Sequence, residues 1–333
     1  MTMHAWAARE KKGPLRSFEY EPTPLGPHDV EIAISHCGIC HSDVHLVDGD
    51  WGVGSYPMVP GHEIVGSVVE RGAAVRHLLV GARVGVGWQR SACLSCEVCL
   101  QGEENLCRSD EATCVEHYGG FADRIRVDAR FAFPIPEALS SEAAAPLLCG
   151  GVTVYAPLSR LARSSMRVGI VGVGGLGHLG IQFARAMGCE VTALSSSPEK
   201  EDDARRLGAH HFVVTREGEA LAGIARTLDV VLSTAFVTQD WPRLVSALRP
   251  NGTLCLVGVP AEPLALSAGA LLGAQRSVTG SAIGGRPAIR EMLDFAARHG
   301  VAAQVQARSM AEADAGLDDV RQGRARYRVV LAT

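Results

Sequence analysis

The sequence predicts an α/β protein in which a β-rich first half is joined to a doubly wound parallel sheet. Three observations predict it: apolar alternation in the first half, a regular exchange of short strands and helices after residue 167, and a length of 333 residues, which suits two domains. Hydrophobic residues make up 47% of the chain and charged residues 20%, a balance that supports buried cores and excludes disorder over the whole chain.

The first half shows strand patterns. Apolar and polar residues alternate over 30–35, and valine-rich runs over 64–69 and 83–86 lie between glycines. These segments predict the strands of a β-rich domain.

From about residue 167 short β-type runs alternate with helical or turn segments, which is typical of parallel strands joined by right-handed crossovers. Pro250-Asn251-Gly252 reads as the turn before the fifth strand, and the Ala/Gly-rich stretch 261–273 shows no clear pattern. The predicted strands cover 167–171, 190–194, 211–214, 229–233, 253–257 and 277–280. The predicted helices cover 175–187, 198–207, 220–225 and 242–248.

The pattern after residue 284 differs from the regular alternation of strands and helices before it. A helix is predicted over 287–299, and a final strand over 326–331 finds no place in the six-stranded sheet. We therefore expect the chain to return to the first domain, with domains over 1–148, 149–284 and 285–333.

Charge and apolar patterning limit the partners. The 32 basic and 36 acidic residues give a net charge of −4 without a sustained basic run, so nucleic acid is not an expected partner. No apolar run of 18 residues predicts a membrane span, and the first residues do not resemble a secretion signal. We expect a cytoplasmic protein whose ten cysteines are reduced.

Four cysteines are clustered in a polar loop, at steps of three, three and eight residues: Cys93, Cys96, Cys99 and Cys107. Four thiolates at this spacing can surround one tetrahedral Zn²⁺ and leave no open position, which is typical of a structural zinc. An iron–sulfur cluster also uses four cysteines, but its common bacterial motif has a shorter last step followed by proline. The spacing favours structural zinc.

A second set of metal-ligand residues is spread along the chain. Cys40, the pair His62-Glu63, and Cys149 each stand beside glycines that let the backbone turn sharply. Taken singly, each is more often a buried core residue. Together, two thiolates and one imidazole would make a zinc site with one open position, which catalysis requires.

The segment 172–177 is a G-x-G-x-x-G motif between a predicted strand and a predicted helix. In that context the motif indicates a dinucleotide site, because its glycines allow close approach of the pyrophosphate to the helix N-terminus. The residues concerned are Gly172, Gly174, Gly175, Leu176 and Gly177.

The segment after the second strand bears on the choice of dinucleotide. NAD-binding sheets carry an acid there for the ribose 2′-hydroxyl, but this chain has Ser195, Ser196, Ser197 and, shortly after, Lys200. Hydroxyls and an ammonium group accept a 2′-phosphate, so the sequence favours NADP over NAD. A polar turn with a helix cap is the alternative interpretation.

Taken together, these motifs resemble the zinc-dependent medium-chain alcohol dehydrogenases over essentially the whole chain, and most closely the cinnamyl alcohol dehydrogenase-like branch with its bacterial broad-range aldehyde reductases. The motifs that carry the resemblance are 38–43, 56–63, the four cysteines, 144–155 and 172–180. The resemblance implies a GroES-like catalytic domain formed by both ends of the chain, a Rossmann domain between them, and a homodimer joined through the Rossmann sheets.

The resemblance also implies roles for individual residues. Cys40, His62 and Cys149 would bind catalytic zinc, with Glu63 as an alternative ligand; Ser42 would contact the substrate oxygen, and His45 and Asp50 would carry the proton to solvent. The implied further cofactor contacts are Thr153, Thr234, Gly258, Ser281, Ala282 and Ile283. The implied pocket residues are Trp51, Trp88 and Ile283.

The expected activity is therefore hydride transfer between NADP(H) and a primary alcohol or aldehyde, with two zinc ions per chain. Only eleven residues separate Cys107 from Gly119, fewer than in the plant enzymes, and Leu46 and Ala282 replace a polar and an aromatic residue of those enzymes. The alternatives are an NAD-dependent alcohol or polyol dehydrogenase, a zinc-free quinone or enoyl reductase of the same fold, and a catalytically silent, zinc-stapled NADP-binding protein.

Overall fold

The computed structural model describes residues 2–216, 218–260 and 262–333, and the chain divides into two compact units. Unit 1 runs to Gly150 and resumes at Gly284, whereas unit 2 comprises Gly151–Ile283. The division thus falls two residues after the first expected boundary and one residue before the second. Cys149 belongs to unit 1 because its thiol lies with the side chains of Cys40 and His62.

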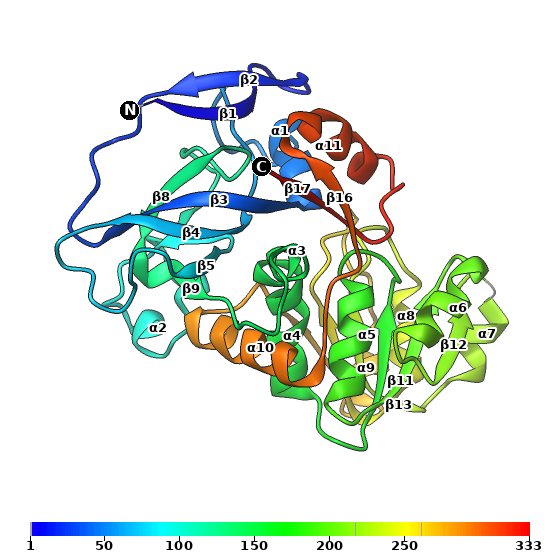
Figure 1. Ribbon diagram of the computed structural model, residues 1–333. Helices are drawn as coiled ribbons and strands as arrows, with labels where there is room; N and C mark the ends of the chain where they lie inside the picture. Colours follow the sequence, from blue (N-terminus) through cyan, green and yellow to red (C-terminus); the bar gives the residue numbers. More distant parts are fainter. Residues whose placement is uncertain (1, 217, 261) are drawn as a thin grey trace. The chain divides into compact units, whose positions relative to one another are not determined.

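Unit 1 is built on a seven-stranded sheet. Its path is β16-β17-β3-β4-β5-β9, with β8 also paired to β3. The pair β16 and β17 is parallel, and the other pairs are antiparallel. The long strands β3 and β4 stand out in Figure 1, where α1 and α11 lie side by side. The strands of unit 1 are β1 (Met3–Ala8), β2 (Leu15–Tyr20), β3 (Asp29–Ile39), β4 (Glu63–Arg71), β5 (Arg83–Val86), β6 (Gln89–Ser91), β7 (Glu111–Ala112), β8 (Arg124–Asp128), β9 (Ala132–Pro134), β16 (Val305–Ser309) and β17 (Arg328–Ala332).

The helices of unit 1 are short except for α10 and α11. Helix α10 starts after Gly285 with Pro287 in its first turn and ends at Gly300, whose φ of 68° is a left-handed conformation that glycine adopts without strain. The α-helices are α1 (His41–Val47), α2 (Glu97–Leu100), α3 (Ser141–Ala144), α10 (Arg286–His299) and α11 (Ala313–Arg321). The 3₁₀ turns are η1 (Glu104–Leu106), η2 (Ala129–Phe131), η3 (Ala145–Leu148) and η5 (Met310–Glu312).

The end of the chain pairs with a strand of the first half. The final strand β17 pairs with β3 of the first half, from Val329 opposite Ile39 to Ala332 opposite His36. Its other neighbour, β16, was not predicted, although Val-Gln-Ala-Arg at 305–308 alternates between apolar and polar residues. Both ends of the chain therefore build the same unit.

Unit 2 is a six-stranded, all-parallel sheet in the order β12-β11-β10-β13-β14-β15, the doubly wound arrangement that the strand and helix alternation predicted. Its strands are β10 (Arg167–Val171), β11 (Glu190–Ser195), β12 (His211–Val214), β13 (Leu228–Ser233), β14 (Leu248–Leu256) and β15 (Ser277–Gly280). Its helices are α5 (Gly177–Ala186), η4 (Pro198–Lys200), α6 (Glu201–Arg206), α7 (Gly218–Gly223), α8 (Trp241–Ala247) and α9 (Ala268–Leu272), and α4 (Gly150–Leu161) starts at the boundary between the units.

The predicted turn at Pro250-Asn251-Gly252 was wrong. Strand β14 begins at Leu248, which pairs with Leu228, and pairing resumes at Thr253 opposite Val230. The three residues form an irregularity inside the strand, with Asn251 at φ 64°, a conformation that asparagine tolerates better than most residues. The featureless stretch 261–273 contains α9, and Ala261 itself lies outside the described residues.

Hydrophobic side chains fill the interior of each unit. The largest fully buried side chains include Phe121, Phe131 and Phe133 in unit 1 and Phe183 in unit 2. In the part of the chain that the structure describes, helices that combine the length and apolar character of a membrane span are absent.

Candidate functional site

The four clustered cysteines surround one point in unit 1. Their sulfur atoms lie 3.5 Å apart for Cys93 and Cys107, and 3.8 Å apart both for Cys93 and Cys99 and for Cys96 and Cys107. A tetrahedron with Zn–S bonds of about 2.3 Å has sulfur atoms about 3.8 Å apart. The four thiols therefore fit one zinc ion and leave no open position.

The pKa values of two of these thiols differ widely. Backbone amides of Ser95 and Cys96 donate hydrogen bonds that lower the pKa of Cys93 to about 6, whereas burial and the neighbouring thiols raise the pKa of Cys99 to about 12. A cation at the centre of the cluster favours the thiolate form of every ligand. The cluster thus already stabilises one thiolate.

The scattered second set also converges in unit 1. Cys40 precedes α1, His62 and Glu63 stand at the start of β4, and Cys149 follows η3. One ligand atom from each of these four buried residues lies within 4.8 Å of the others. The pairing of β3 with β4 places Gly38 opposite Glu63, which brings the first two segments together.

Asp43 makes hydrogen bonds to the segments that carry Cys40 and His62. Its Oδ2 accepts a hydrogen bond from the backbone amide of Cys40 at 2.8 Å, and its Oδ1 accepts one from the amide of Gly61 at 2.8 Å. The same Oδ1 lies 3.0 Å from Nδ1 of His62. One fully buried carboxylate thus fixes two ligand segments and the orientation of the imidazole.

The other imidazole nitrogen provides a test of the metal assignment. Nε2 of His62 is buried and has no hydrogen-bond partner among residues 2–216, 218–260 and 262–333. A buried polar atom without a partner is costly, and a metal bond satisfies it. Two thiols, this nitrogen and a nearby carboxylate form a donor set that suits zinc.

The charges of the set favour a bound cation. A hydrogen bond from Cys149 and the neighbouring His62 hold the pKa of Cys40 well below its usual range, although burial opposes them. Burial alone would lower the pKa of His62, but Asp43 and Cys149 raise it above its usual range. The surroundings therefore favour the anionic form of the Cys40 sulfur, and a divalent ion at this point would favour that form further.

Glu63 is paired with a residue from the far end of the chain. Its Oε1 accepts a hydrogen bond from the guanidinium of Arg328 in β17, and both side chains are buried. Burial raises the pKa of Glu63 to about 7, although the charge of Arg328 opposes that shift. Oε2 of Glu63 has no partner in the described residues, which leaves it available as a fourth ligand.

The residues predicted for proton transfer lie near this set. Ser42 Oγ lies 3.6 Å from the sulfur of Cys40. Farther along α1, His45 Nδ1 lies 3.0 Å from Asp50 Oδ2, and both side chains are partly open to solvent.

The two predicted tryptophans form an aromatic row that starts at His62. The ring of Trp88 meets that of His62 at 4.9 Å, Trp51 meets Trp88 at 6.1 Å, and His45 stacks on Trp51 at 5.2 Å. Both tryptophans therefore belong to the surroundings of the metal-ligand set in unit 1.

The glycine motif of unit 2 has the geometry that its sequence predicts. It connects β10 to α5, and a Cβ on Gly177 would lie 1.7 Å from the carbonyl oxygen of Gly172. A Cβ on Gly174, by contrast, would meet no atom of the described chain within 4 Å. The backbone therefore packs closely at Gly177, whereas the space next to Gly174 is open. Phosphate binding requires such a close turn with an accessible backbone.

The serine segment follows β11. Ser195 is buried and its Oγ accepts a hydrogen bond from the amide of Ser197 at 3.1 Å, whereas Ser196 is exposed. Lys200 Nζ donates to the carbonyl oxygen of Val173 at 2.8 Å, which holds the ammonium group beside the glycine motif.

The other predicted cofactor contacts also lie in unit 2. Thr234 Oγ1 donates to the carbonyl oxygen of Val171 at 2.8 Å, directly before the glycine motif, and Gly258 packs against the backbone of Ala235. Ser281 Oγ accepts a hydrogen bond from Arg160 at 2.9 Å. Thr153 lies in α4, and Ala282 and Ile283 close the unit.

Sequence reasoning missed three residues of the metal-ligand region. Asp43 stands inside a motif that was recognised, and its spacing of three from Cys40 could have suggested a cap. Arg328 gave no local signal, because 265 residues separate it from Glu63. Cys114, whose sulfur lies 3.9 Å from Nδ1 of His62, stands outside both predicted ligand sets.

Two family models match the chain. Residues 26–137 match the alcohol dehydrogenase GroES-like domain, and residues 175–298 match the zinc-binding dehydrogenase model.

Individual proteins match over nearly the full length. The aldehyde reductase AdhA of Synechocystis sp. is 43% identical and covers 98% of both chains. The structure of a cinnamyl alcohol dehydrogenase from Sorghum bicolor is 38% identical with a TM-score of 0.96, covering 100% of this chain and 98% of that one. A cinnamyl alcohol dehydrogenase structure from Helicobacter pylori, complexed with NADP(H), is 32% identical with a TM-score of 0.91 over 100% and 98% of the two chains.

Proposed function

Because this chain belongs to the zinc-binding alcohol dehydrogenase family, in the branch of the cinnamyl alcohol dehydrogenases, we propose that it interconverts primary alcohols and aldehydes with NADP(H) and two zinc ions per chain. The observation that carries the proposal is the convergence of Cys40, His62 and Cys149, with one imidazole nitrogen held by Asp43 and the other buried without a partner in the described residues.

Cys40, His62 and Cys149 are the ligands we assign to catalytic zinc, with Glu63 as an alternative ligand. A zinc ion bound there supplies a Lewis acid that lowers the pKa of an alcohol oxygen or polarises an aldehyde carbonyl. Asp43 accepts from His62 Nδ1 and so directs Nε2 toward the ligand position. Arg328 holds Glu63 by one oxygen and leaves the other available.

The chain's own residues handle the proton. The hydroxyl of Ser42, beside Cys40, would accept the proton of the alcohol or donate one during aldehyde reduction. His45, oriented by Asp50, would exchange that proton with water, because a third of its side chain is exposed and an imidazole can both accept and donate a proton.

The charges and hydrogen-bond donors after β11 favour NADP over NAD. Strand β11 ends in Ser195 without a carboxylate, and Ser196, Ser197 and Lys200 follow it with hydroxyl and ammonium donors. A 2′-phosphate would gain charge-assisted hydrogen bonds there. The Helicobacter pylori relative, complexed with NADP(H), supports the same choice. When bound, this cofactor supplies or accepts the hydride.

The four-cysteine cluster would hold the second zinc ion in a structural role. With four thiolate ligands the ion has no position for substrate, so it acts by tying the loop between Cys93 and Cys107.

The expected substrates are a broad range of small aldehydes and primary alcohols. Trp51 and Trp88 provide an apolar surface next to His62. Apolar surfaces discriminate weakly between related side chains, which suits a broad range.

The decisive experiment combines elemental analysis with a coupled activity measurement on the same sample. Zinc content per chain is determined, and NADPH oxidation is then recorded with a panel of small aldehydes and with NADH for comparison. We expect two zinc ions per chain and aldehyde-dependent loss of NADPH.

Other outcomes would overturn parts of the proposal. One zinc ion per chain and no turnover after zinc repletion would leave only the structural site and favour a silent NADP-binding protein. Turnover with polyols in preference to aldehydes, or with NADH in preference to NADPH, would replace the substrate or the cofactor assignment.

A further inference from the structure

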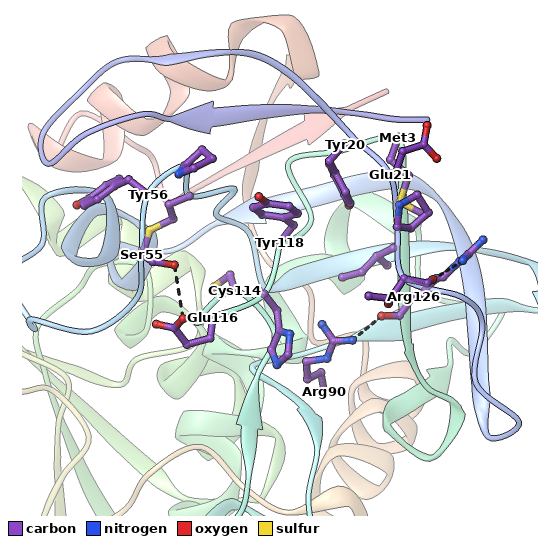
Figure 2. Close-up of a pocket in the computed structure, with 16 residues that line it drawn as sticks. Met3, Tyr20, Glu21, Ser55, Tyr56, Arg90, Cys114, Glu116, Tyr118 and Arg126 are labelled. Carbon is purple, nitrogen blue, oxygen red and sulfur yellow. Dashed lines mark hydrogen bonds between the residues drawn. The ribbon is translucent and has the colours of Figure 1, made fainter. Parts of the chain in front are cut away.

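Unit 1 contains a cavity of about 440 Å³ that the proposed function does not use. It lies beside the N-terminal hairpin β1–β2 and is lined from segments 20–23, 55–58, 114–118 and 125–126, with Met3 and Arg90 (Figure 2). The volume falls in the range of small-molecule sites, which is about 300 to 1,000 Å³.

This cavity is separate from the proposed catalytic site. Cys40, Cys149 and the two tryptophans are not among its lining residues. It approaches the metal-ligand set only through Cys114, which forms part of its wall and whose sulfur lies 3.9 Å from Nδ1 of His62.

Arg90 gives the cavity a preference for a negatively charged ligand. Its side chain is 21% exposed, and within the described part of the chain its hydrogen bond goes from Nη2 to the backbone oxygen of Arg126 at 2.9 Å. Its ion-pair partner, Glu111, is 4.0 Å away and is shared with His117. Burial lowers the pKa of Arg90, although the charges of Glu111 and Asp29 oppose that shift. Such a guanidinium binds a carboxylate well.

Two carboxylates also line the cavity. They do not cancel its preference for an anion, because both are exposed to solvent and have other partners. Glu21 accepts a hydrogen bond from Thr2, and Glu116 accepts one from Ser55. Arg126, the second lining guanidinium, is already paired with Glu31 at 2.7 Å.

Aromatic side chains provide the apolar part of the wall. The rings of Tyr20 and Tyr118 lie 4.5 Å apart, and Phe18 supports both from the hairpin. Figure 2 shows Tyr118, Cys114 and Arg90 on the wall of the same cavity. A flat ring would therefore contact tyrosine while its charged group meets the guanidinium.

We propose that this cavity is a second ligand site that binds a small aromatic carboxylate, with the carboxylate on Arg90 and the ring against Tyr20 and Tyr118. The site is independent of hydride transfer, so an occupant could stay bound during turnover.

The test uses benzoate as the probe and the zinc-loaded, full-length protein in isothermal titration calorimetry. We expect one benzoate per chain, and binding at least tenfold weaker in Arg90→Gln. Arg124→Gln is the matched control, because Arg124, like Arg90, is a partly exposed arginine paired with a glutamate, but it does not line the cavity. Aldehyde reduction by Arg90→Gln should remain at the wild-type level, which also shows that the variant folds.

Two comparisons separate this site from others. Benzoate should bind more tightly than cyclohexanecarboxylate, and Tyr118→Leu should remove that preference. Binding that persists in Cys149→Ser supports the cavity, whereas binding lost in Cys149→Ser but kept in Arg90→Gln would assign the carboxylate to the catalytic metal. An absence of benzoate binding to the wild-type protein, or equal binding to wild type and Arg90→Gln, would overturn the proposal.

Discussion

Single side chains decide whether the metal-ligand set can do chemistry. Cys149 reaches Cys40 and His62 from a segment more than eighty residues away, and its thiol is buried with them. A site with three protein ligands depends on each of them, since the loss of one leaves the ion with too few strong donors.

We expect Cys149→Ser to lower kcat for aldehyde reduction by about a thousandfold or more, because losing several kcal/mol of Lewis-acid stabilisation costs about tenfold per 1.4 kcal/mol. NADPH binding, followed by its fluorescence, and the free energy of unfolding should change little. Cys255→Ala, a buried cysteine of unit 2, is the control. Near-normal turnover in Cys149→Ser would remove this residue from the site.

In the proposed site, Asp43 is a positioning residue that would act on the metal through its contact with His62. Asp43→Asn should weaken zinc binding by about 10- to 100-fold, because an amide orients the imidazole less strongly than a carboxylate. The measurement is zinc loss to a competing chelator. Asp48→Asn is the control, since Asp48 lies just after α1 and pairs with Arg321. Equal zinc retention in both variants would contradict this role.

Ser195 occupies the end of β11, where a carboxylate would select NAD. Ser195→Asp should lower the ratio of kcat/KM for NADPH to that for NADH by at least about tenfold, because a negative charge repels a 2′-phosphate. Ser195→Ala should change the ratio much less. An unchanged ratio in Ser195→Asp would show that this segment does not select the cofactor.

Among the elements, η1 and α10 are joined by an ion pair between the buried carboxylate of Glu104 and the partly exposed guanidinium of Arg286. Glu104 of η1 is 1% exposed, and its two oxygens accept hydrogen bonds from the backbone amide of Arg286 at 2.9 Å and from Nε of Arg286 at 2.7 Å. Since Arg286 is the first residue of α10, the carboxylate also satisfies a free amide at the helix N-terminus.

We expect Glu104→Gln to lower the free energy of unfolding of the zinc-loaded protein by about 2 kcal/mol, because the buried carboxylate that accepts two hydrogen bonds is lost and the partly exposed guanidinium of Arg286 loses its counterion. Urea denaturation followed by circular dichroism measures the effect. Glu97→Gln, an exposed carboxylate in α2, should change stability by less than about 0.5 kcal/mol. Equal stability of the two variants would rule out an anchoring role for Glu104.

At the scale of the whole molecule, one edge of the unit 2 sheet is a candidate surface for dimer formation. Strand β15 is the last in the sheet order, and Val259 and Leu272 of the same unit are 82% and 77% exposed. An open strand edge and exposed apolar side chains are typical of a surface that pairs with another chain. Together with the family resemblance, they support a homodimer through the Rossmann units.

The prediction is a mass of two chains by light scattering after size-exclusion chromatography, about 70 kDa from 35.2 kDa per chain. Val259→Glu combined with Leu272→Glu should shift the protein toward the monomer, because buried charge opposes association. Leu79→Glu, at an equally apolar exposed position of unit 1, should not. A monomeric wild-type protein would contradict the dimer.

The sequence by itself determined the features that depend on short spacing: the doubly wound sheet, the glycine motif between β10 and α5, and the four-cysteine cluster, because their residues are neighbours in the chain and local backbone geometry brings them together. Residue type and neighbouring glycines suggested the ligand set of Cys40, His62 and Cys149, and the family resemblance supported it. The pairing of Glu63 with Arg328, the position of Cys114 beside His62, the pairing of β16 with β17 and the cavity at Arg90 became visible only in the tertiary structure. The physical reason is that sheet pairing joins segments hundreds of residues apart. The sequence of one segment alone does not identify the segment with which it pairs.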